Sequence, residues 1–400
     1  MQEPPLSVSV PPRRAAVAFI LVTLGIDALG VGLVIPITPE LVRQLTGGHA
    51  TGAAFAVGLT VAVFAFAQLL ASPILGALSD RFGRRPVMLL SISGIAANYV
   101  LLAWAPSLAW LYLGRLLAGA TSANVSTASA YIADVSTPVQ RARRFGLVGA
   151  TFGAAFVFGP ALGGWLGGIS LRLPFVVAAA LAGANALYGL LVLPESLPPE
   201  RRQPFAWHGA NPVAALRYLA ADRVLRRLAV AWSCLTFGMG ALQAVFVLST
   251  AQRFAWGPPQ NGAALAAVGL SGAVVQGLLV RGITARLGDR GAVLLGTAAN
   301  AVAYVGFGLA PVGWAVYPAI AAYALGQVAS PALRALVSAQ AGPERQGRTM
   351  GALSVVEGLT AIAGPLIASL LFVRLTALPF LAAAALFLVA FAAVRRLPSG

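Results

Sequence analysis

The stretch Gly76-Ala77-Leu78-Ser79-Asp80-Arg81-Phe82-Gly83-Arg84-Arg85 is a short charged segment that separates two long apolar runs, residues 57–75 and 86–104. Each run is close to the roughly 20 residues that a helix needs to cross the hydrocarbon of a bilayer. Three arginines between two such helices favour the cytoplasmic side of a membrane. That preference does not explain the aspartate or the glycines. Gly83 can take the positive φ of a tight turn, and Gly76 permits close helix packing.

The composition is that of a membrane protein. Of 400 residues, 59% are hydrophobic and 10% are charged, and the mean hydropathy is +0.85. An ordinary soluble domain does not reach these values. The net charge of +16 could indicate a nucleic-acid partner, but all 27 basic residues are arginines in short loops between apolar runs. Because no basic stripe carries stacking aromatics, the sequence predicts a lipid environment and no nucleic acid.

The sequence offers little for catalysis or metal binding. Cys234 lies in an apolar run, and both histidines, His49 and His208, fall in predicted loops. The sequence has no Cys pair for a disulfide or zinc site and no phosphate-binding GxxxxGK[ST] loop. We therefore expect neither an enzyme nor an ATP-driven pump, and neither a metal nor another cofactor.

Hydropathy predicts an all-α polytopic membrane protein with twelve transmembrane helices. The first apolar run is too long for the core of a signal peptide, so we interpret it as a retained helix. The predicted spans are residues 15–38, 53–75, 87–105, 108–133, 144–167, 173–193, 225–250, 260–281, 291–310, 313–340, 348–371 and 377–394.

The loop arginines alternate between the two sides of the predicted membrane. One side holds most of them, whereas the other holds only Arg43, Arg172, Arg253 and Arg374. The positive-inside rule makes the arginine-rich side cytoplasmic and places both termini there. An error of one span would break this alternation. We therefore expect a multi-pass protein of the inner (cytoplasmic) membrane of the cell.

The longest polar connection divides the spans six and six. We expect an N-terminal six-helix bundle over residues 1–194, a cytoplasmic linker loop over 195–224 and a C-terminal bundle over 225–400. Landmarks of the two halves recur 205 residues apart, which predicts a pseudo-symmetric pair of bundles made by duplication. The landmarks are Arg81–Arg85 with Arg286–Arg290, Gly146 with Gly351, and Gly159-Pro160 with Gly364-Pro365.

Four charged residues fall well away from the ends of the predicted spans, and a charge at the bilayer centre costs about 2.5–3.5 kcal/mol. They are Asp27 in the first span, Arg115 in the fourth, Arg334 in the tenth and Glu357 in the eleventh. Arg334 and Glu357 lie at similar depths, and each is unfavourable without a partner. We predict that they form an ion pair with Glu357 as a second titratable site; a purely structural pair is the open alternative.

Six stretches of the chain, between about residues 18 and 371, resemble the tetracycline/proton antiporters of the major facilitator superfamily. The first stretch quoted above has the superfamily pattern G-x-L-x-D-R-x-G-R-R. Gly159-Pro160, with Gly163 and Gly164, resembles the antiporter motif of the fifth span, a small-residue face with a kinking proline. The six stretches are Asp27–Pro36, Gly76–Arg85, Leu111–Arg115, Tyr131–Asp134, Gly159–Gly164 and Glu344–Gly347.

The resemblance implies roles for individual residues. Asp27 matches an aspartate needed for coupled transport, since a carboxylate that faces a cavity can be neutralised by a proton or a cationic substrate. Arg115 matches an arginine near the proton site, and Gln68 a residue near the substrate path. Asp80 matches the gate aspartate that meets the start of the eleventh helix when the cytoplasmic gate is closed. Such a contact is worth only ~0.3–1 kcal/mol, so each transport cycle can break it.

The chain also departs from that family. Asn98 and Asn300 stand where the family has membrane aspartates, and Gly272 stands where it has a histidine. Asparagine keeps hydrogen bonding but cannot release a proton, so Asp27 is the proton carrier left in the first half. Polar residues of the spans are predicted to line a central cavity, although helix–helix hydrogen bonding explains each of them singly. These residues are Gln68, Asn98, Asn124, Gln276 and Asn300.

We expect a proton-coupled exporter of a small amphipathic drug, of the tetracycline type before others, that works by alternating access. A proton-coupled exporter of another drug or a metabolite on the same fold stays open, because three family positions differ. A non-transporting membrane scaffold is the remote alternative. The expected partners are the drug, protons and lipid; any divalent cation would travel with the drug, and the chain is expected to act as a monomer.

Overall fold

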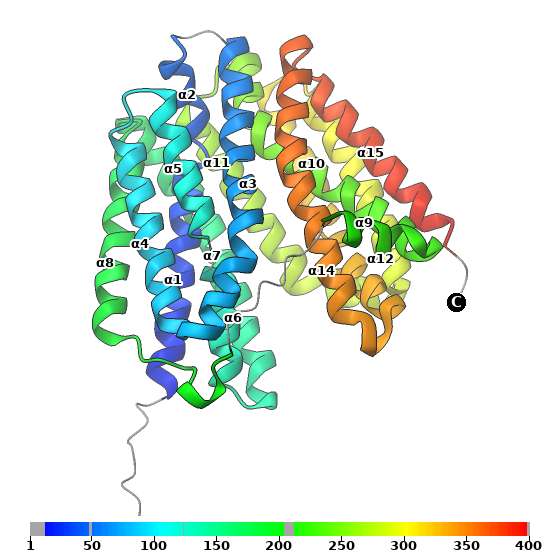
Figure 1. The fold of residues 1–400 in the computed structure, drawn as a ribbon. Helices are drawn as coiled ribbons and strands as arrows, with labels where there is room; N and C mark the ends of the chain where they lie inside the picture. The colour runs from blue at the N-terminus through cyan, green and yellow to red at the C-terminus, as the bar shows by residue number, and fades with distance from the viewer. Residues whose placement is uncertain (1–12, 48–49, 123, 204–211, 398–400) are drawn as a thin grey trace, which may run out of the picture.

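The computed structural model describes residues 13–47, 50–122, 124–203 and 212–397, and this part of the chain is helical without a strand (Figure 1). The first half holds α1 (Arg13–Val34), α2 (Thr38–Leu45), α3 (Ala50–Phe82), α4 (Arg84–Ala103), α5 (Leu108–Ala120), α6 (Asn124–Asp134), α7 (Pro138–Ile169) and α8 (Leu173–Val192). The second half follows η1 (Pro199–Arg201) and holds α9 (Pro212–Ala221), α10 (Arg223–Phe254), α11 (Pro258–Val274), η2 (Val275–Leu279), α12 (Val280–Leu309), η3 (Gly313–Ala315), α13 (Val316–Gly326), α14 (Ala329–Arg374) and α15 (Leu378–Arg395).

The described helices account for twelve membrane crossings. Ten helical segments in the described part are long and apolar enough to span a bilayer. One of them, residues 258–309, is 52 residues long and bends at Gly288, so it crosses twice. The 13-residue α5 and the 11-residue α6 are each too short alone and together make one broken span. The all-α, twelve-helix prediction is therefore confirmed.

The two halves repeat each other in their irregularities as well as in their helices. The tight turn at Gly83 (φ +106°) recurs at Gly288 (φ +65°). The break between α5 and α6 recurs, 205 residues later, between α13 and α14 at Gln327 and Val328. Glycine is required at both turns because other residues seldom take a positive φ.

Some predicted boundaries were wrong. The first span ends at Val34, because Pro36 has no N–H to continue the helix, and α2 follows with Pro39 in its first turn. The fourth and tenth spans are broken rather than continuous. The predicted linker loop contains the helix α9, whose Tyr218 hydroxyl lies 2.8 Å from the Thr349 hydroxyl on α14.

Glycines set the contact between the halves. On one side of the interface α7 packs against α1 and α11; on the other, α14 packs against α10 and α3. A Cβ built on Gly58 of α3 would lie 2.7 Å from the carbonyl oxygen of Pro365 in α14. The halves are in contact toward the end that holds α2, called here the α2 end. They diverge toward the end that holds residues 76–85, called here the motif end (Figure 1).

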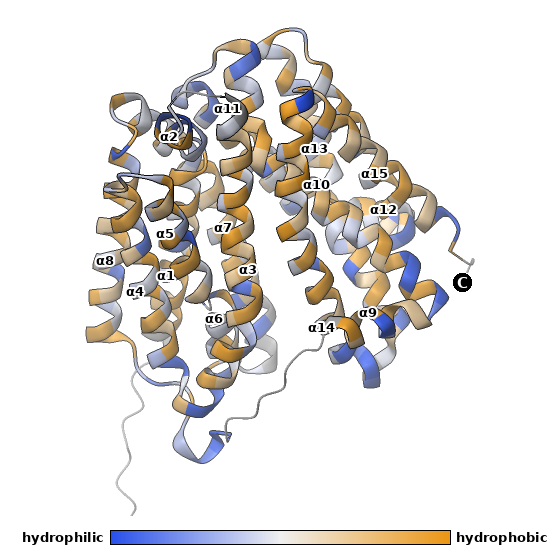
Figure 2. Ribbon diagram, turned by 45° about the horizontal axis from the view of Figure 1, so that its top comes forward, coloured by the Kyte–Doolittle hydropathy of each residue, from blue (hydrophilic) through white to orange (hydrophobic). Residues whose placement is uncertain are grey.

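The outer faces of the bundles are apolar (Figure 2). Large apolar side chains such as Leu191, Leu278 and Val302 are more than half exposed along these faces. A contiguous apolar surface of this kind is expected where lipid takes the place of water. The chain is therefore a multi-pass membrane protein.

Arginines at the α2 end hold helix termini. The Arg172 guanidinium donates to the carbonyl oxygens of Ala103 and Ala105 at 2.8 and 3.1 Å, beyond the end of α4. Arg253 does the same at the end of α12, donating to Phe307 at 2.7 Å and Ala310 at 2.5 Å. Because the last carbonyls of a helix lack partners within it, these two arginines have a structural reason to lie on the arginine-poor side.

Candidate functional site

Asp27 occupies the middle of α1 and has a single partner. Its Oδ2 accepts a hydrogen bond from the side-chain amide of Asn124. Its Oδ1 is buried without a hydrogen-bond partner, and within the described residues Asp27 makes no ion pair. A change in the protonation of this carboxylate would therefore break no salt bridge.

The break in the fourth span positions Asn124. The chain closes α5 with Thr121 N–H donating to the Leu117 carbonyl at 3.0 Å, and α6 begins at Asn124. Gln68 of α3 donates from Nε2 to the Ser122 hydroxyl within the break, at 2.8 Å. Two residues predicted to line a cavity, Gln68 and Asn124, thus lie beside one interruption of a helix.

The corresponding position in the second half carries no acid. Trp232 stands 205 residues after Asp27 and is 2% exposed. The guanidinium carbon of Arg334 lies 4.8 Å from the centroid of its indole, which is a cation–π contact. Of these two corresponding positions, only the one in the first half holds a carboxylate.

Arg115 and Asn98 form a pair between α5 and α4. Nη2 of Arg115 donates to Oδ1 of Asn98 at 3.1 Å, and the Phe64 ring centroid lies 5.8 Å from the guanidinium carbon. Asn98 is 1% exposed, so the structure makes it a partner of Arg115 rather than a residue of an open cavity.

A cavity of about 370 Å³ lies within the second half. Gln276, on the π-helical turn η2, donates to the Gln327 carbonyl at 3.2 Å, and Asn300 donates to the Gly326 carbonyl at 3.1 Å. Single π-turns are frequent at functional sites. The polar lining consists of Gln276, Asn300, Tyr323, Gln327, Ser330 and Arg334.

Gly272 contributes to this cavity through its small size. A Cβ built on it would lie 3.1 Å from Nε2 of Gln327. The glycine therefore leaves space for the glutamine side chain at the break of the tenth span. This relation could not be predicted from the sequence, because the two residues are far apart in the chain.

The structure brings Arg334 and Glu357 together, as the sequence predicted. Nη2 of Arg334 lies 3.4 Å from Oε2 of Glu357, and the two side chains are 57% and 46% exposed. A single long contact between exposed groups is worth only about 0–1 kcal/mol. Whether this weak pair takes part in transport stays a prediction.

The charged segment 76–85, called here the motif loop although only Gly83 lies outside a helix, is held by contacts within the first half. Asp80 and Arg84 form an ion pair at 2.6 Å, and Nε of Arg84 lies 3.4 Å from Asp134 at the end of α6. Arg85 donates to the Leu190 carbonyl at 2.8 Å, and Arg81 stacks beside Phe82. Asp134, the last residue of the stretch Tyr131–Asp134, is therefore part of this network.

Glu195 also holds the motif loop, and sequence reasoning missed it. Its carboxylate accepts the backbone N–H groups of Arg84 at 2.8 Å and Arg85 at 3.2 Å. These are first-turn N–H groups of α4, which have no partner within the helix. A Cβ on Gly83 would collide with this carboxylate, so the glycine is needed for space as well as for its positive φ. An acidic residue just after a span was the only signal in the sequence.

The small residues of the antiporter motif lie where α7 meets two other helices. A Cβ built on Gly159 would lie 2.8 Å from Cα of Gly32, and one built on Gly163 would meet the backbone of Leu33, both on α1. On Gly164 the added atom would lie 2.8 Å from Cα of Gly262, which belongs to α11 in the other half. The δ-carbon of Pro160 faces Gly32 as well.

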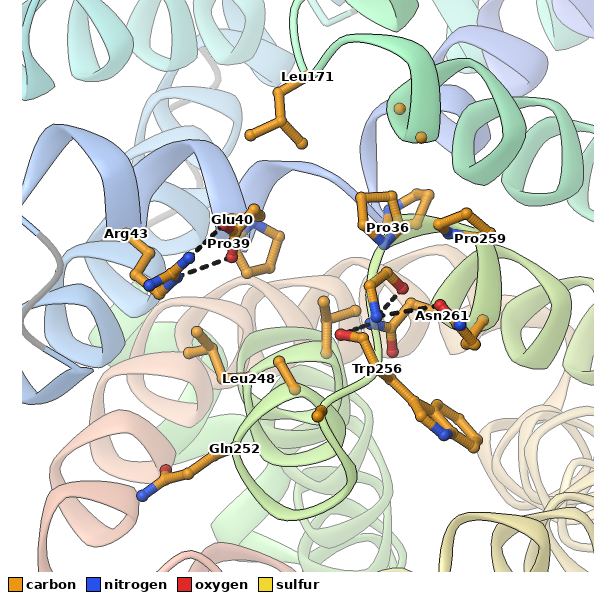
Figure 3. A pocket seen from close by; sticks show the side chains of 18 of the residues that line it. Pro36, Pro39, Glu40, Arg43, Leu171, Leu248, Gln252, Trp256, Pro259 and Asn261 are labelled. Carbon is orange, nitrogen blue, oxygen red and sulfur yellow. Dashed lines mark hydrogen bonds and ion pairs between the residues drawn. The ribbon is translucent and has the colours of Figure 1, made fainter.

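A second cavity, of about 800 Å³, lies between the halves at the α2 end (Figure 3). Arg43 and Glu40 of α2 form an ion pair at 2.5 Å on one wall. The hydrogen bond and charge of Glu40 hold the pKa of Arg43 above its ordinary value. On the opposite wall Asn261 donates to the Gly257 carbonyl at 3.1 Å. We call this space the end pocket; the sequence did not predict it.

Side chains for metal binding do not gather in this structure. No cluster of three His, Cys, Asp or Glu side chains occurs among the residues that are described. His49 and His208 lie outside those residues.

The chain matches the Major Facilitator Superfamily over residues 20–330. The chain belongs to this superfamily. Among its relatives, the class C tetracycline resistance protein of Escherichia coli is 38% identical over 385 residues, which is 95% of this chain and 96% of that protein. The class G tetracycline resistance protein of Vibrio anguillarum is 36% identical over 374 residues, 88% of this chain and 89% of the other.

A solved structure of this superfamily is similar throughout. The human organic anion transporter MFSD10 (TETRAN) superimposes with a TM-score of 0.72 at 28% identity, covering 96% of this chain and all of that one. A Major Facilitator protein with two six-helix halves transports rather than catalyses. The geometry of this chain is therefore that of a membrane transporter.

Proposed function

We propose that this chain exports a tetracycline-type drug across the inner membrane in exchange for protons. The support for the cargo is the similarity to tetracycline resistance proteins along nearly the whole chain. The observation that carries the coupling is Asp27, an intramembrane carboxylate whose Oδ1 is buried without a partner. A carboxylate in a membrane interior without a countercharge is favourable only when it gains a proton or a cation.

The conformation fits one stage of such a cycle. The halves touch at the α2 end and diverge at the motif end, which we propose to be cytoplasmic because the arginines gather there. The molecule is then in its inward-open state. Closure of the motif end would bring Asp80 toward the start of the eleventh span, and the ion pair of Asp80 with Arg84 is the interaction that would have to rearrange.

The cargo would bind between the halves, near the middle of the membrane. Gln68 and Asn124 of the first half and Gln276 and Asn300 of the second are the polar groups we assign to it. A cavity of about 370 Å³ already opens beside the last two. The chain is proposed to work as a monomer, in lipid, with both termini in the cytoplasm.

The test is drug uptake into everted membrane vesicles from cells that express the full chain. We expect tetracycline to accumulate when respiration acidifies the vesicle interior, and the accumulation to vanish on addition of a protonophore. Asp27→Asn should abolish uphill uptake with unchanged expression, whereas Glu200→Gln, which removes an exposed acid of η1, should not. Uptake that persists with the protonophore, or at the normal rate in Asp27→Asn, would refute the coupling.

Another cargo on the same fold is the second candidate. Asn98, Gly272 and Asn300 differ from the family pattern, and each has a specific contact in this structure. If vesicles fail to accumulate tetracycline yet show proton release driven by another drug or metabolite, this candidate replaces the first.

A further inference from the structure

Arg115 lies inside the fourth span and has no charged acceptor in the described part of the chain. Its one hydrogen bond goes to the neutral amide oxygen of Asn98, at 3.1 Å. Its Nε is buried with no acceptor, and it forms no ion pair anywhere in the described ranges. A guanidinium carries five N–H donors and stays charged in a protein.

Other arginines of the chain have more, or more strongly charged, acceptors than Arg115. Arg84 has two carboxylates, Asp80 and Asp134, within 4.0 Å. Arg172 and Arg253 each donate to two backbone carbonyls. The chain thus supplies two acceptors to each of these arginines, whereas at Arg115 it supplies a single amide.

The chain does not supply a countercharge for Arg115 from the nearest embedded acid either. Asp27 is engaged by Asn124 and makes no ion pair with Arg115 in the described structure. A charge held in a membrane without a partner is unfavourable. A charge-assisted hydrogen bond to an ionised oxygen is roughly twice as strong as one to a neutral amide. Arg115 therefore favours any anionic oxygen that can reach it.

The surroundings of Arg115 fit an aromatic acid. The Phe64 ring centroid lies 5.8 Å from its guanidinium carbon, which gives an apolar face beside the charge. On the same helix as Phe64, Gln68 offers an amide and lies against Ser122. Arg115 as a residue is half-buried, and its Nε is buried beside these side chains.

We propose that Arg115 is the receptor for an acidic group of the cargo, so that the compound carried by this chain has at least one ionised oxygen. The inference rests on the proposed transport function and specifies the charge of its substrate. Asn98 is the residue that leaves the position open: with an aspartate there, the guanidinium would be neutralised by the chain itself.

Binding of matched acids and amides to the purified full-length protein in detergent tests this. The probes are 2-naphthoic acid with 2-naphthamide, and 4-phenylbutyric acid with its amide. Binding is measured as the ligand-dependent rise in the thermal unfolding midpoint. We expect each acid to bind at least tenfold more tightly than its amide. Equal affinity of acid and amide in both pairs would overturn the proposal.

Two isosteric variants separate the assignment from a general loss of structure. Asn98→Asp should raise the unfolding midpoint without ligand, because it gives Arg115 a carboxylate, and should reduce the acid preference at least tenfold. Asn185→Asp, at another buried asparagine of the same half, should leave the acid preference unchanged. An acid preference that survives Asn98→Asp would place the acid site elsewhere and overturn the assignment.

Chloride distinguishes a cargo acid from an inorganic ion. If chloride at constant ionic strength raises the unfolding midpoint and displaces the naphthoate, Arg115 binds a small inorganic anion and the cargo assignment is wrong. The vesicle experiment fails independently: proton-driven tetracycline uptake without any acid preference would leave the proposed function intact and refute only this inference.

Discussion

Gly164 lets the two halves come into backbone contact at the α2 end, and a single methyl group there tests that contact. In Gly164→Ala the new Cβ would lie 2.8 Å from Cα of Gly262 and would also meet the carbonyl oxygen of Pro258. Both are backbone atoms that cannot rotate away. Overpacking typically costs about 1–3 kcal/mol. Because the contact exists only while α7 and α11 are together, the closed α2 end should become about 5- to 150-fold less populated relative to the open one.

Cysteine labelling measures this shift. Leu248 lines the end pocket and is buried, so a cysteine at that position, in a Cys234→Ser background, reports opening of the α2 end. We expect Gly164→Ala to increase the labelling rate by an impermeant maleimide. The matched control is Gly153→Ala on the same helix, where the added Cβ would lie 3.9 Å from Ala273, an ordinary contact. Equal labelling rates in the two variants would refute the reasoning.

Two further predictions concern the charged groups. Glu357→Gln and Arg334→Gln should each change stability by less than about 1 kcal/mol, and a double-mutant cycle of drug uptake decides whether the pair functions, since additive losses would exclude coupling. Glu195→Gln should destabilise the protein by about 0.5–2 kcal/mol, because it weakens the cap of α4. The thermal unfolding midpoint of this variant is compared with that of the control Glu200→Gln. Equal midpoints would contradict the prediction.

Much of the fold could be predicted because the bilayer imposes simple constraints on the sequence. A helix must be about 20 apolar residues long to cross, and arginines between such runs are distributed unequally between the sides. The repeat was visible as Gly159-Pro160 and Gly364-Pro365. In the structure each proline packs against a glycine of a neighbouring helix. Pro160 lies against Gly32 of α1, and Pro365 lies against Gly240 of α10.

The irregularities could not be predicted from hydropathy. An interruption of two or three residues at Thr121 or Gln327 leaves the average hydrophobicity of its run unchanged, so each broken span was expected to be continuous. The π-turn at Val275–Leu279 and the helix α9 left no distinct signal either. All three kinds of feature depend on what packs against the segment.

For the candidate site, the sequence identified the embedded charges but few of their partners. Asp27 and Arg115 were visible because a charge within an apolar run is rare. Asn124 and Asn98 were expected along a cavity, and the structure adds that each lies against one of these charges. Such pairings join different helices, and a single sequence contains no distance information between them.

Trp232, which stands in the second half where Asp27 stands in the first, marks a chemical difference between the two halves. Both halves have the glycine turn (Gly83 and Gly288) and the broken span, yet the place that holds an acid in one holds an indole in the other. If the two halves rock as proposed, their shared helices are enough for the motion, and the proposed coupling needs an acid at this place in one half only. Residues of the other half can then change without loss of the acid. Changes of substrate specificity in such proteins are therefore expected to accumulate unevenly between the two halves.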